Sequence, residues 1–174
     1  MPAERLILIG SRGSGKSTVG ELLAQRLGWR FADTDAAIEA AAGRSIADIF
    51  ATEQEAGFRN RETAVLQELC QEPKLVLATG GGAVLRPSNR ALLRSAGFVV
   101  WLQVSAEVAW ARLQADPTTA ARRPNLTATG GLEEVRTLLT AREPLYREMA
   151  DFTIRTDRPS PEAVATAILL AWAG

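Results

Sequence analysis

Residues 10–17 read Gly-Ser-Arg-Gly-Ser-Gly-Lys-Ser and match the phosphate-binding pattern G-x-x-x-x-G-K-[ST]. An apolar run at residues 6–9 precedes this pattern, and a stretch with helical periodicity follows it. In such a loop, glycines let successive backbone N–H groups point at phosphate oxygens, and the helix N-terminus adds partial positive charge. Lys16 is expected to reach the β- and γ-phosphates, and the Ser17 hydroxyl to ligate Mg²⁺. The sequence therefore predicts a nucleoside triphosphate site, in which Arg12 either touches the γ-phosphate or faces solvent.

Asp33 and Asp35 follow a short segment, residues 30–32, that is expected to form a strand. Ligands of parallel sheets gather at the carboxyl ends of the strands, where the γ-phosphate and an acceptor would meet. One carboxylate can hold Mg²⁺, while the other accepts a hydrogen bond, and then a proton, from an acceptor hydroxyl. Residues 79–82, after the next strand, lack the acid that many phosphate-loop enzymes use for the metal, so we assign Asp33 to it. An Asx turn ending the strand explains the two acids equally well.

Two further features are candidates for binding the acceptor. Residues 80–82 are three consecutive glycines, which expose bare N–H groups to a ligand, although a tight turn would also require glycine. Arg59 and Glu62 are three residues apart in a helix expected to begin near Phe58, so they share one face. The carboxylate then orients the guanidinium toward a second anion; an ordinary surface ion pair is the alternative.

Arg142 falls inside the apolar stripe of another expected helix, four residues after Leu138 and four before Tyr146. A charge on an inward face is costly unless it is paired, so Arg142 either meets a buried acid or faces a ligand cavity, and we favour the cavity. Pro144 is expected to kink this helix or to begin a new turn. The two arginines suggest that the acceptor carries a carboxylate or phosphate, and Asp35 suggests hydroxyl groups. The expected substrate is a small hydroxy acid.

Composition narrows the class of protein. The 174 residues, 47% of them hydrophobic, are enough for one core and are expected to form a single domain, residues 1–174. Twenty basic residues balance twenty acidic ones, so we expect no nucleic-acid or membrane partner. Histidine is absent, which excludes catalytic triads and histidine metal sites. The single cysteine, Cys70, is expected to pack in the core of a cytoplasmic protein, and residues 163–173 to form a buried helix rather than a membrane span.

Apolar runs at residues 6–9, 75–78, 98–102 and 152–154, with the segment at 30–32, alternate with helical periodicity. This alternation predicts an α/β three-layer sandwich, in which a five-stranded parallel sheet has helices on both faces. Residues 116–131 interrupt it with prolines, threonines, glycines and the pair Arg122-Arg123. We expect this segment to be a mobile lid.

Taken together, these residues resemble the shikimate kinase family, in the nucleoside monophosphate kinase-like branch of phosphate-loop proteins. The likeness runs along almost the whole chain. The features that carry it are the loop at residues 10–17, Asp33-Thr34-Asp35, Gly57-Phe58-Arg59 with Glu62, Thr79-Gly80-Gly81-Gly82, Arg123-Pro124, and Arg142 with Pro144-Leu145-Tyr146. Their order and spacing are far more specific than any one of them.

The resemblance implies a P-loop NTPase fold and transfer of the γ-phosphoryl group of ATP to the 3-hydroxyl of shikimate, a step toward chorismate and the aromatic amino acids. It implies an acceptor-binding region at about residues 33–62. The expected catalytic residues are Lys16, Asp35 and the lid arginine Arg123. The expected ATP-binding residues are Gly13, Ser14, Gly15, Lys16, Ser17, Thr18, Arg123, Arg158 and Pro159. The expected acceptor-binding residues are Asp35, Phe58, Arg59, Gly80, Gly81, Gly82 and Arg142. Ser17 and Asp33 are expected to hold Mg²⁺.

Three other functions share some of these features. A nucleoside monophosphate kinase is one, but Arg59 and Asp35 together suit a carboxylated polyol better than a nucleotide. A kinase of another small hydroxy acid, such as gluconate, would use the same loop and lid, but the Asp-Thr-Asp, Phe-Arg and Gly-Gly-Gly set argues against it. A nucleotide-binding module without catalysis is the alternative from a different class, and retention of Lys16, Ser17, Asp33 and Arg123 argues against that. We expect ATP and shikimate as small-molecule partners and a monomeric enzyme.

Overall fold

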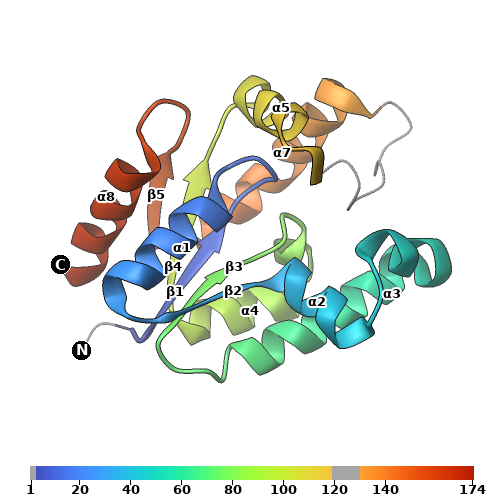
Figure 1. Cartoon of the computed structure of the whole chain (residues 1–174), viewed down its shortest axis with the longest axis horizontal. Coiled ribbons are helices and arrows are strands. Elements are labelled where there is room, and N and C mark those ends of the chain that lie inside the picture. Colours follow the sequence, from blue (N-terminus) through green and yellow to red (C-terminus); the bar gives the residue numbers. More distant parts are fainter. Residues whose placement is uncertain (1–2, 119–129) are drawn as a thin grey trace.

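The computed structural model describes residues 3–118 and 130–174 and places one parallel sheet between two layers of helices (Figure 1). The described elements, in chain order, are β1 (Arg5–Ile9), α1 (Lys16–Leu27), β2 (Arg30–Asp33), α2 (Thr34–Ala42), α3 (Ile46–Leu69), β3 (Leu75–Ala78), the 3-10 turn η1 (Ala83–Leu85), α4 (Pro87–Ala96), β4 (Phe98–Gln103), α5 (Ala106–Ala115), α7 (Gly131–Met149), β5 (Phe152–Arg155) and α8 (Pro161–Ala173).

The five strands lie in the order β2-β3-β1-β4-β5, and each neighbouring pair is parallel. Within β1, Leu6 lies opposite Val76 of β3 and Phe98 of β4. Each strand matches its expected range to within one residue at either end. The central strands β1, β3 and β4 are buried on both faces, so each is a nearly continuous apolar run in the sequence. The predicted five-stranded parallel sheet is confirmed.

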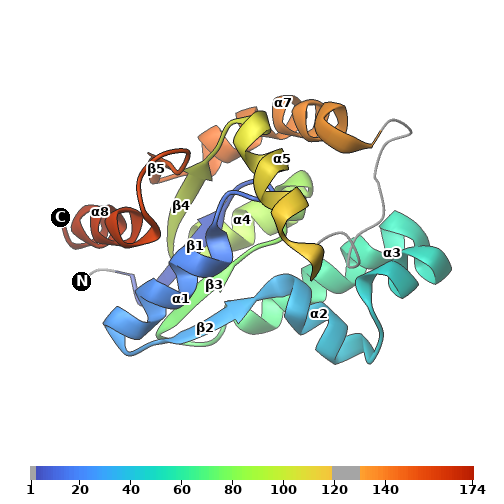
Figure 2. The ribbon, with the colours of Figure 1, turned by 45° about the horizontal axis from the view of Figure 1, so that its top comes forward.

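Alternate residues of β1 serve two separate cores. Leu6 and Leu8 face the layer of α1 and α8, whereas Ile7 and Ile9 face the layer that contains α3, α4 and α7. Figure 2 shows α1 and α8 on one side of the sheet and α3 and α4 on the other. The three-layer arrangement is therefore confirmed, and it brings the loops after β1, β2, β3 and β4 to one edge of the sheet.

Three local expectations need correction. The helix expected near Phe58 begins at Ile46, and it contains a kink at Gln54, where φ is 59° and ψ is −169°. Of the two outcomes expected at Pro144, a kink or a new turn, the new turn is wrong, because α7 continues through this residue to Met149. The C-terminal helix is buried on one side only, since Leu170 is 71% exposed. In the two described ranges, no helix combines the length and the apolar character that crossing a membrane requires.

Cys70 is buried at the end of α3 and belongs to the core that α3 and α4 share with the sheet. This is the packing role expected for it. Burial raises the pKa of its thiol, so the neutral form is favoured.

Candidate active site

The loop between β1 and α1 curls around the ammonium group of Lys16. Its Nζ donates hydrogen bonds to the carbonyl oxygens of Gly10 at 2.8 Å and Ser11 at 2.7 Å. Gly13 and Gly15 have φ of 76° and 94°, values that side chains disfavour, and a Cβ on Gly13 would lie 2.6 Å from the carbonyl oxygen of Ala109. The loop therefore has the glycine-dependent curvature that the motif predicts.

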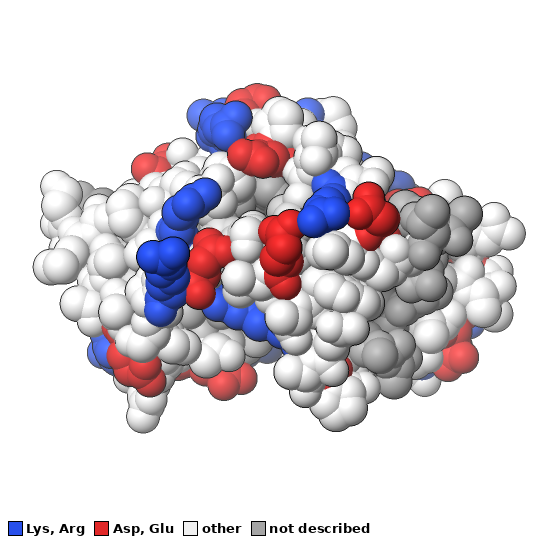
Figure 3. Space-filling model, turned by 90° about the horizontal axis from the view of Figure 1, so that it is seen from above, with Lys and Arg blue, Asp and Glu red and all other residues white. Residues whose placement is uncertain are grey.

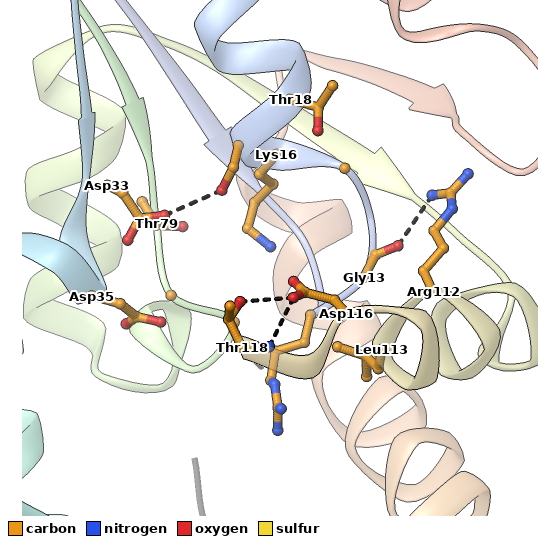
Figure 4. A pocket seen from close by; sticks show the side chains of 15 residues that line it. Gly13, Lys16, Thr18, Asp33, Asp35, Thr79, Arg112, Leu113, Asp116 and Thr118 are labelled. Atoms are coloured by element: carbon orange, nitrogen blue, oxygen red, sulfur yellow. Dashed lines mark hydrogen bonds between the residues drawn. The ribbon is translucent and has the colours of Figure 1, made fainter. Parts of the chain in front are cut away.

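A cavity of about 420 Å³ opens beside this loop (Figure 4). It lies at the carboxyl ends of β1, β2 and β3 and reaches the end of α5. Lys16 lies between the acids Asp33 and Asp35 on one side and Arg112 on the other. The expected site residues that line it are Gly13, Gly15, Lys16, Ser17, Thr18, Asp33, Asp35, Gly80 and Gly81. Arg12 lines it as well, so this side chain faces the cavity.

Asp33 caps a helix and also contacts the phosphate loop. It is the N-cap of α2 and accepts a hydrogen bond from the backbone N–H of Ala36 at 3.1 Å. Its other carboxylate oxygen accepts one from the hydroxyl of Ser17 at 3.4 Å. The Asx turn and the pairing with the phosphate loop therefore coexist.

Hydroxyl and carboxylate oxygens are the donors that Mg²⁺ prefers, and this ion commonly takes one or two protein ligands, with water and phosphate oxygens completing its octahedron. Ser17 and Asp33 supply that number of donors at the edge of the cavity. In residues 3–118 and 130–174, no group of three or more His, Cys, Asp or Glu side chains forms a metal cluster. The donor set fits a phosphate-bound magnesium ion rather than a cage made entirely by protein.

The three glycines after β3 are fixed from two sides. The backbone N–H of Gly80 donates to the hydroxyl of Thr34 at 2.8 Å, and the phenol of Tyr146 donates to the carbonyl oxygen of Gly81 at 2.5 Å. Arg142 is buried, and its Nη1 would lie 3.3 Å from a Cβ at Gly81. The structure thus brings Arg142 to the glycine turn at the rim of the cavity, although this side chain does not line the cavity itself.

Arg59 approaches the same turn from α3. Arg59 is 5% exposed, and its Nη1 binds the fully buried Glu62 at 2.8 Å, so the alternative of an ordinary surface pair is wrong. A Cβ on Gly82 would lie only 2.3 Å from Nη2 of Arg59. Phe58, an expected acceptor contact, is fully buried and packs against Phe50 with ring centroids 4.8 Å apart. It contributes to the core behind Arg59 and does not line the cavity.

Arg112 and Thr156 are contacts of the phosphate loop that the sequence analysis missed. Arg112 donates to the carbonyl oxygen of Gly13 at 3.1 Å, and Thr156 donates to that of Ser14 at 2.8 Å. The guanidinium of Arg112 also donates to the backbone of Thr156. The signal that could have found them is their place after β4 and β5, at the edge of the sheet that carries the other loops.

The remaining expected residues lie after β5 or in the expected lid. Pro159 lines a small cavity of about 170 Å³ with Thr18 and Arg112. It also lines a second hollow, together with Arg158 and Ser105. Of the expected lid, residues 116–118 and 130–131 are described. Arg122 and Arg123 lie outside the described residues.

The described start of the lid carries Asp116, which accepts hydrogen bonds from the backbone and hydroxyl of Thr118 at 3.0 and 2.7 Å and lines the cavity. In Figure 3, which looks down on the edge of the sheet that holds these loops, basic and acidic side chains lie next to one another around the middle of the surface. The cavity itself is lined by residues of both signs, the cations Arg12, Lys16 and Arg112 and the acids Asp33, Asp35 and Asp116.

Comparison with known proteins identifies the family. The family model described as "Shikimate kinase" matches residues 12–173. A shikimate kinase from Rhodopirellula baltica is 46% identical over 168 residues, which cover 97% of this chain and 90% of that protein. The chain belongs to the shikimate kinase family. It is therefore a kinase, and the P-loop NTPase fold expected from the sequence is confirmed.

Solved structures agree with this family. A shikimate kinase from Acinetobacter baumannii, solved in complex with shikimate, superposes with a TM-score of 0.89 at 42% identity, covering 96% of this chain and 91% of that one. A gluconokinase from Sinorhizobium meliloti 1021 superposes with a TM-score of 0.61 at 19% identity, covering 99% of this chain and 92% of that one, which shows a shared fold alone.

Proposed function

We propose that this enzyme transfers the γ-phosphoryl group of ATP to the 3-hydroxyl of shikimate, giving shikimate 3-phosphate and ADP. Its membership of the shikimate kinase family and its similarity to a structure in complex with shikimate support this reaction. The geometric observation that carries the proposal is the convergence of two buried arginines on the glycine turn beside the phosphate loop. Arg142 lies at Gly81 and Arg59 at Gly82, and Gly81 lines the same cavity as Lys16.

The phosphate loop binds the ATP phosphates in this proposal. Its backbone N–H groups and the N-terminus of α1 attract the anion. Lys16 exchanges its hydrogen bonds to the carbonyl oxygens of Gly10 and Ser11 for the β- and γ-phosphate oxygens. Ser17 and Asp33 would hold Mg²⁺, which neutralises phosphate charge when bound. Arg112 and Thr156 keep the loop in shape by binding its carbonyl oxygens from behind.

The acceptor lies across the cavity from the phosphate loop. Arg59 and Arg142 bind its carboxylate next to the glycine turn, and Asp35, which lines the cavity, accepts a hydrogen bond from its hydroxyl. The hydroxyl oxygen forms a bond to the γ-phosphorus, and the bond from that phosphorus to the β–γ bridging oxygen breaks, so ADP leaves with that oxygen. Because the transition state is loose, Asp35 mainly orients the hydroxyl, and it receives the proton as the new bond completes.

Several roles in this proposal rest on the family resemblance. Arg123 is assigned to the transferred phosphoryl group as the lid arginine. Pro159, in a hollow next to Thr18, is assigned to the adenine side of ATP together with Arg158. We also propose that the enzyme is a cytoplasmic monomer with small-molecule partners and no nucleic-acid or membrane partner. Size-exclusion chromatography with light scattering tests the oligomeric state.

Steady-state ADP release with ATP, Mg²⁺ and shikimate tests the reaction, with gluconate and nucleoside monophosphates as parallel acceptors. We expect turnover with shikimate to exceed turnover with the other acceptors by orders of magnitude. Asp35→Asn should abolish most of this turnover while equilibrium binding of ATP persists. Turnover with gluconate alone would keep the phosphate site and reject the acceptor assignment. Absence of turnover with every acceptor would favour a non-catalytic nucleotide-binding module.

A further inference from the structure

Arg59, which is proposed to bind the carboxylate of the acceptor, contacts a second glutamate, Glu55, in addition to the buried Glu62. Its Nη2 contacts Oε1 of Glu55 at 3.3 Å, one helical turn earlier on α3. The two acids differ sharply in environment. Glu62 is fully buried, whereas the side chain of Glu55 is 57% exposed to solvent. The nitrogen that Glu55 contacts is also the nitrogen closest to Gly82, at the turn where the acceptor carboxylate is placed.

We propose that Glu55 occupies Arg59 in place of the acceptor carboxylate, leaves when the acceptor binds, and thereby sets the affinity for carboxylated acceptors. The inference rests on the proposed function, in which Arg59 binds that carboxylate. Two carboxylates that compete for one guanidinium nitrogen repel each other at close range, so binding of the acceptor and the Glu55 contact oppose each other.

The geometry of the Glu55 contact suits exchange. Charge-assisted hydrogen bonds are typically about 2.7–2.9 Å long, so a 3.3 Å contact from a half-exposed side chain is weak, and water readily replaces it. Nη1 of Arg59 stays bound to Glu62 at 2.8 Å when Glu55 leaves. Nε of Arg59 is buried and has no hydrogen-bond partner within the described ranges, so the guanidinium has donor capacity beyond its two glutamates.

The neighbouring Glu53, in contrast to Glu55, is bound closely by two arginines. It receives hydrogen bonds from Nε and Nη2 of Arg61 at 2.9 and 2.8 Å and a further one from Arg44. These hydrogen bonds, that of Arg61 foremost, lower the pKa of Glu53 to about 2. Glu53 is therefore charged at neutral pH and paired with Arg44 and Arg61.

The kink at Gln54 separates the two acids. Its φ of 59° and ψ of −169° belong to a region that residues other than glycine rarely adopt. A Cβ on Gly57 would lie 2.3 Å from the Cβ of Glu53, so the chain also needs glycine there to close the kink. Because of this backbone, Glu53 pairs with Arg44 and Arg61, whereas Glu55 pairs with Arg59. Strain of this kind is characteristic of sites where geometry matters for function.

The experiment compares wild type, Glu55→Gln and the matched control Glu68→Gln. Glu68 is an exposed acid on the same helix, α3, and its replacement removes the same charge. For each protein, KM and kcat are measured with shikimate and with ATP, and equilibrium affinity is measured by calorimetry for shikimate and for its methyl ester, which lacks the carboxylate charge. Thermal melts establish that each variant is folded.

We expect Glu55→Gln to lower the KM and the dissociation constant for shikimate about two- to five-fold, the range that corresponds to loss of one exposed ion pair. The KM for ATP, the kcat and the affinity for the methyl ester stay within about 1.5-fold of wild type, as do all constants of Glu68→Gln. An unchanged or raised KM for shikimate in Glu55→Gln overturns the inference, and so does an equal gain for the methyl ester. Wild type that does not phosphorylate shikimate overturns the proposed function as well.

Discussion

Replacing Gly82 by alanine tests how far activity depends on the position of Arg59, separately from the other properties of the acceptor site. The φ of Gly82 is −96°, so alanine introduces no backbone strain there. Its Cβ, however, would lie 2.3 Å from Nη2 and 2.5 Å from Nη1 of Arg59, where ordinary van der Waals contact begins near 3.4 Å. The guanidinium must therefore move by about 1 Å, or the glycine turn must move away from it.

Neither movement is easy in this part of the molecule. Arg59 is 5% exposed and is bound to the buried Glu62, and the turn is held by Thr34 at Gly80 and by Tyr146 at Gly81. Overpacking of a filled interior costs about 1–3 kcal/mol, and a domain of this size loses about 2–4 °C in Tm per kcal/mol. A misplacement of about 1 Å in a substrate-positioning group costs about 100-fold in rate.

We therefore expect Gly82→Ala to lower kcat/KM for shikimate by about 100-fold while the KM for ATP stays within about two-fold, because no contact of the phosphate loop changes. Gly81→Ala is the control. The added Cβ would lie 3.3 Å from Nη1 of Arg142 and 3.6 Å from the next nearest atoms. The kcat/KM of Gly81→Ala for shikimate should therefore fall by less than about ten-fold. The assay is coupled ADP release, with thermal melts for both variants. A folded Gly82→Ala enzyme with wild-type kcat/KM, or equal losses in the two variants, would refute the reasoning.

Three other changes test separate parts of the structure. Asp33→Asn keeps a good N-cap for α2, so the Tm of this variant should stay close to that of wild type, whereas its turnover at saturating Mg²⁺ should fall at least about ten-fold. Asp33→Ala should in addition lose about 1 kcal/mol of stability in urea unfolding. Gln54→Gly should raise stability by about 1 kcal/mol in the same assay, because glycine adopts the observed φ and ψ without strain. The pKa of Glu53 is lowered from 4.5 to about 2, so its ion pairs stabilise the fold above pH 4.5 and are lost as the pH falls toward 2. The stability difference between wild type and Glu53→Gln should therefore shrink steadily below pH 5, and a difference that is constant with pH would contradict the assignment.

Periodicity and motif spacing were enough to predict the sheet and the phosphate loop. The central strands β1, β3 and β4 are apolar runs because both of their faces are buried, and the loop needs glycine at Gly13 and Gly15, where φ is positive. Such features depend on residues close together in the chain. The pairing of Arg59 with Glu62 was predictable for the same reason, since residues three apart share a helix face.

Contacts between distant segments were not predictable in the same way. The kink is centred on Gln54, which is not a glycine, and the neighbouring Glu53 pairs with Arg44 and Arg61, which lie nine and eight residues away in the chain. Arg112 and Thr156 bind backbone carbonyl oxygens, which residues of any type supply, so their place after β4 and β5 was the only sequence signal for them. Phe58 was assigned to the acceptor from the family resemblance. Adjacent helical residues point in different directions, and the structure places its ring in the core.

Thr34 links the parts of this site more directly than its place between two aspartates suggests. Asp33 contacts Ser17 of the phosphate loop, Asp35 lines the cavity, and the buried hydroxyl of Thr34 accepts the backbone N–H of Gly80. One short segment at the end of β2 thus fixes the spacing between the proposed metal ligand, the proposed hydroxyl ligand and the glycine turn that meets the acceptor arginines. Because phosphoryl transfer depends on alignment more than on strong acids or bases, this spacing is as important to the reaction as the charges that it positions.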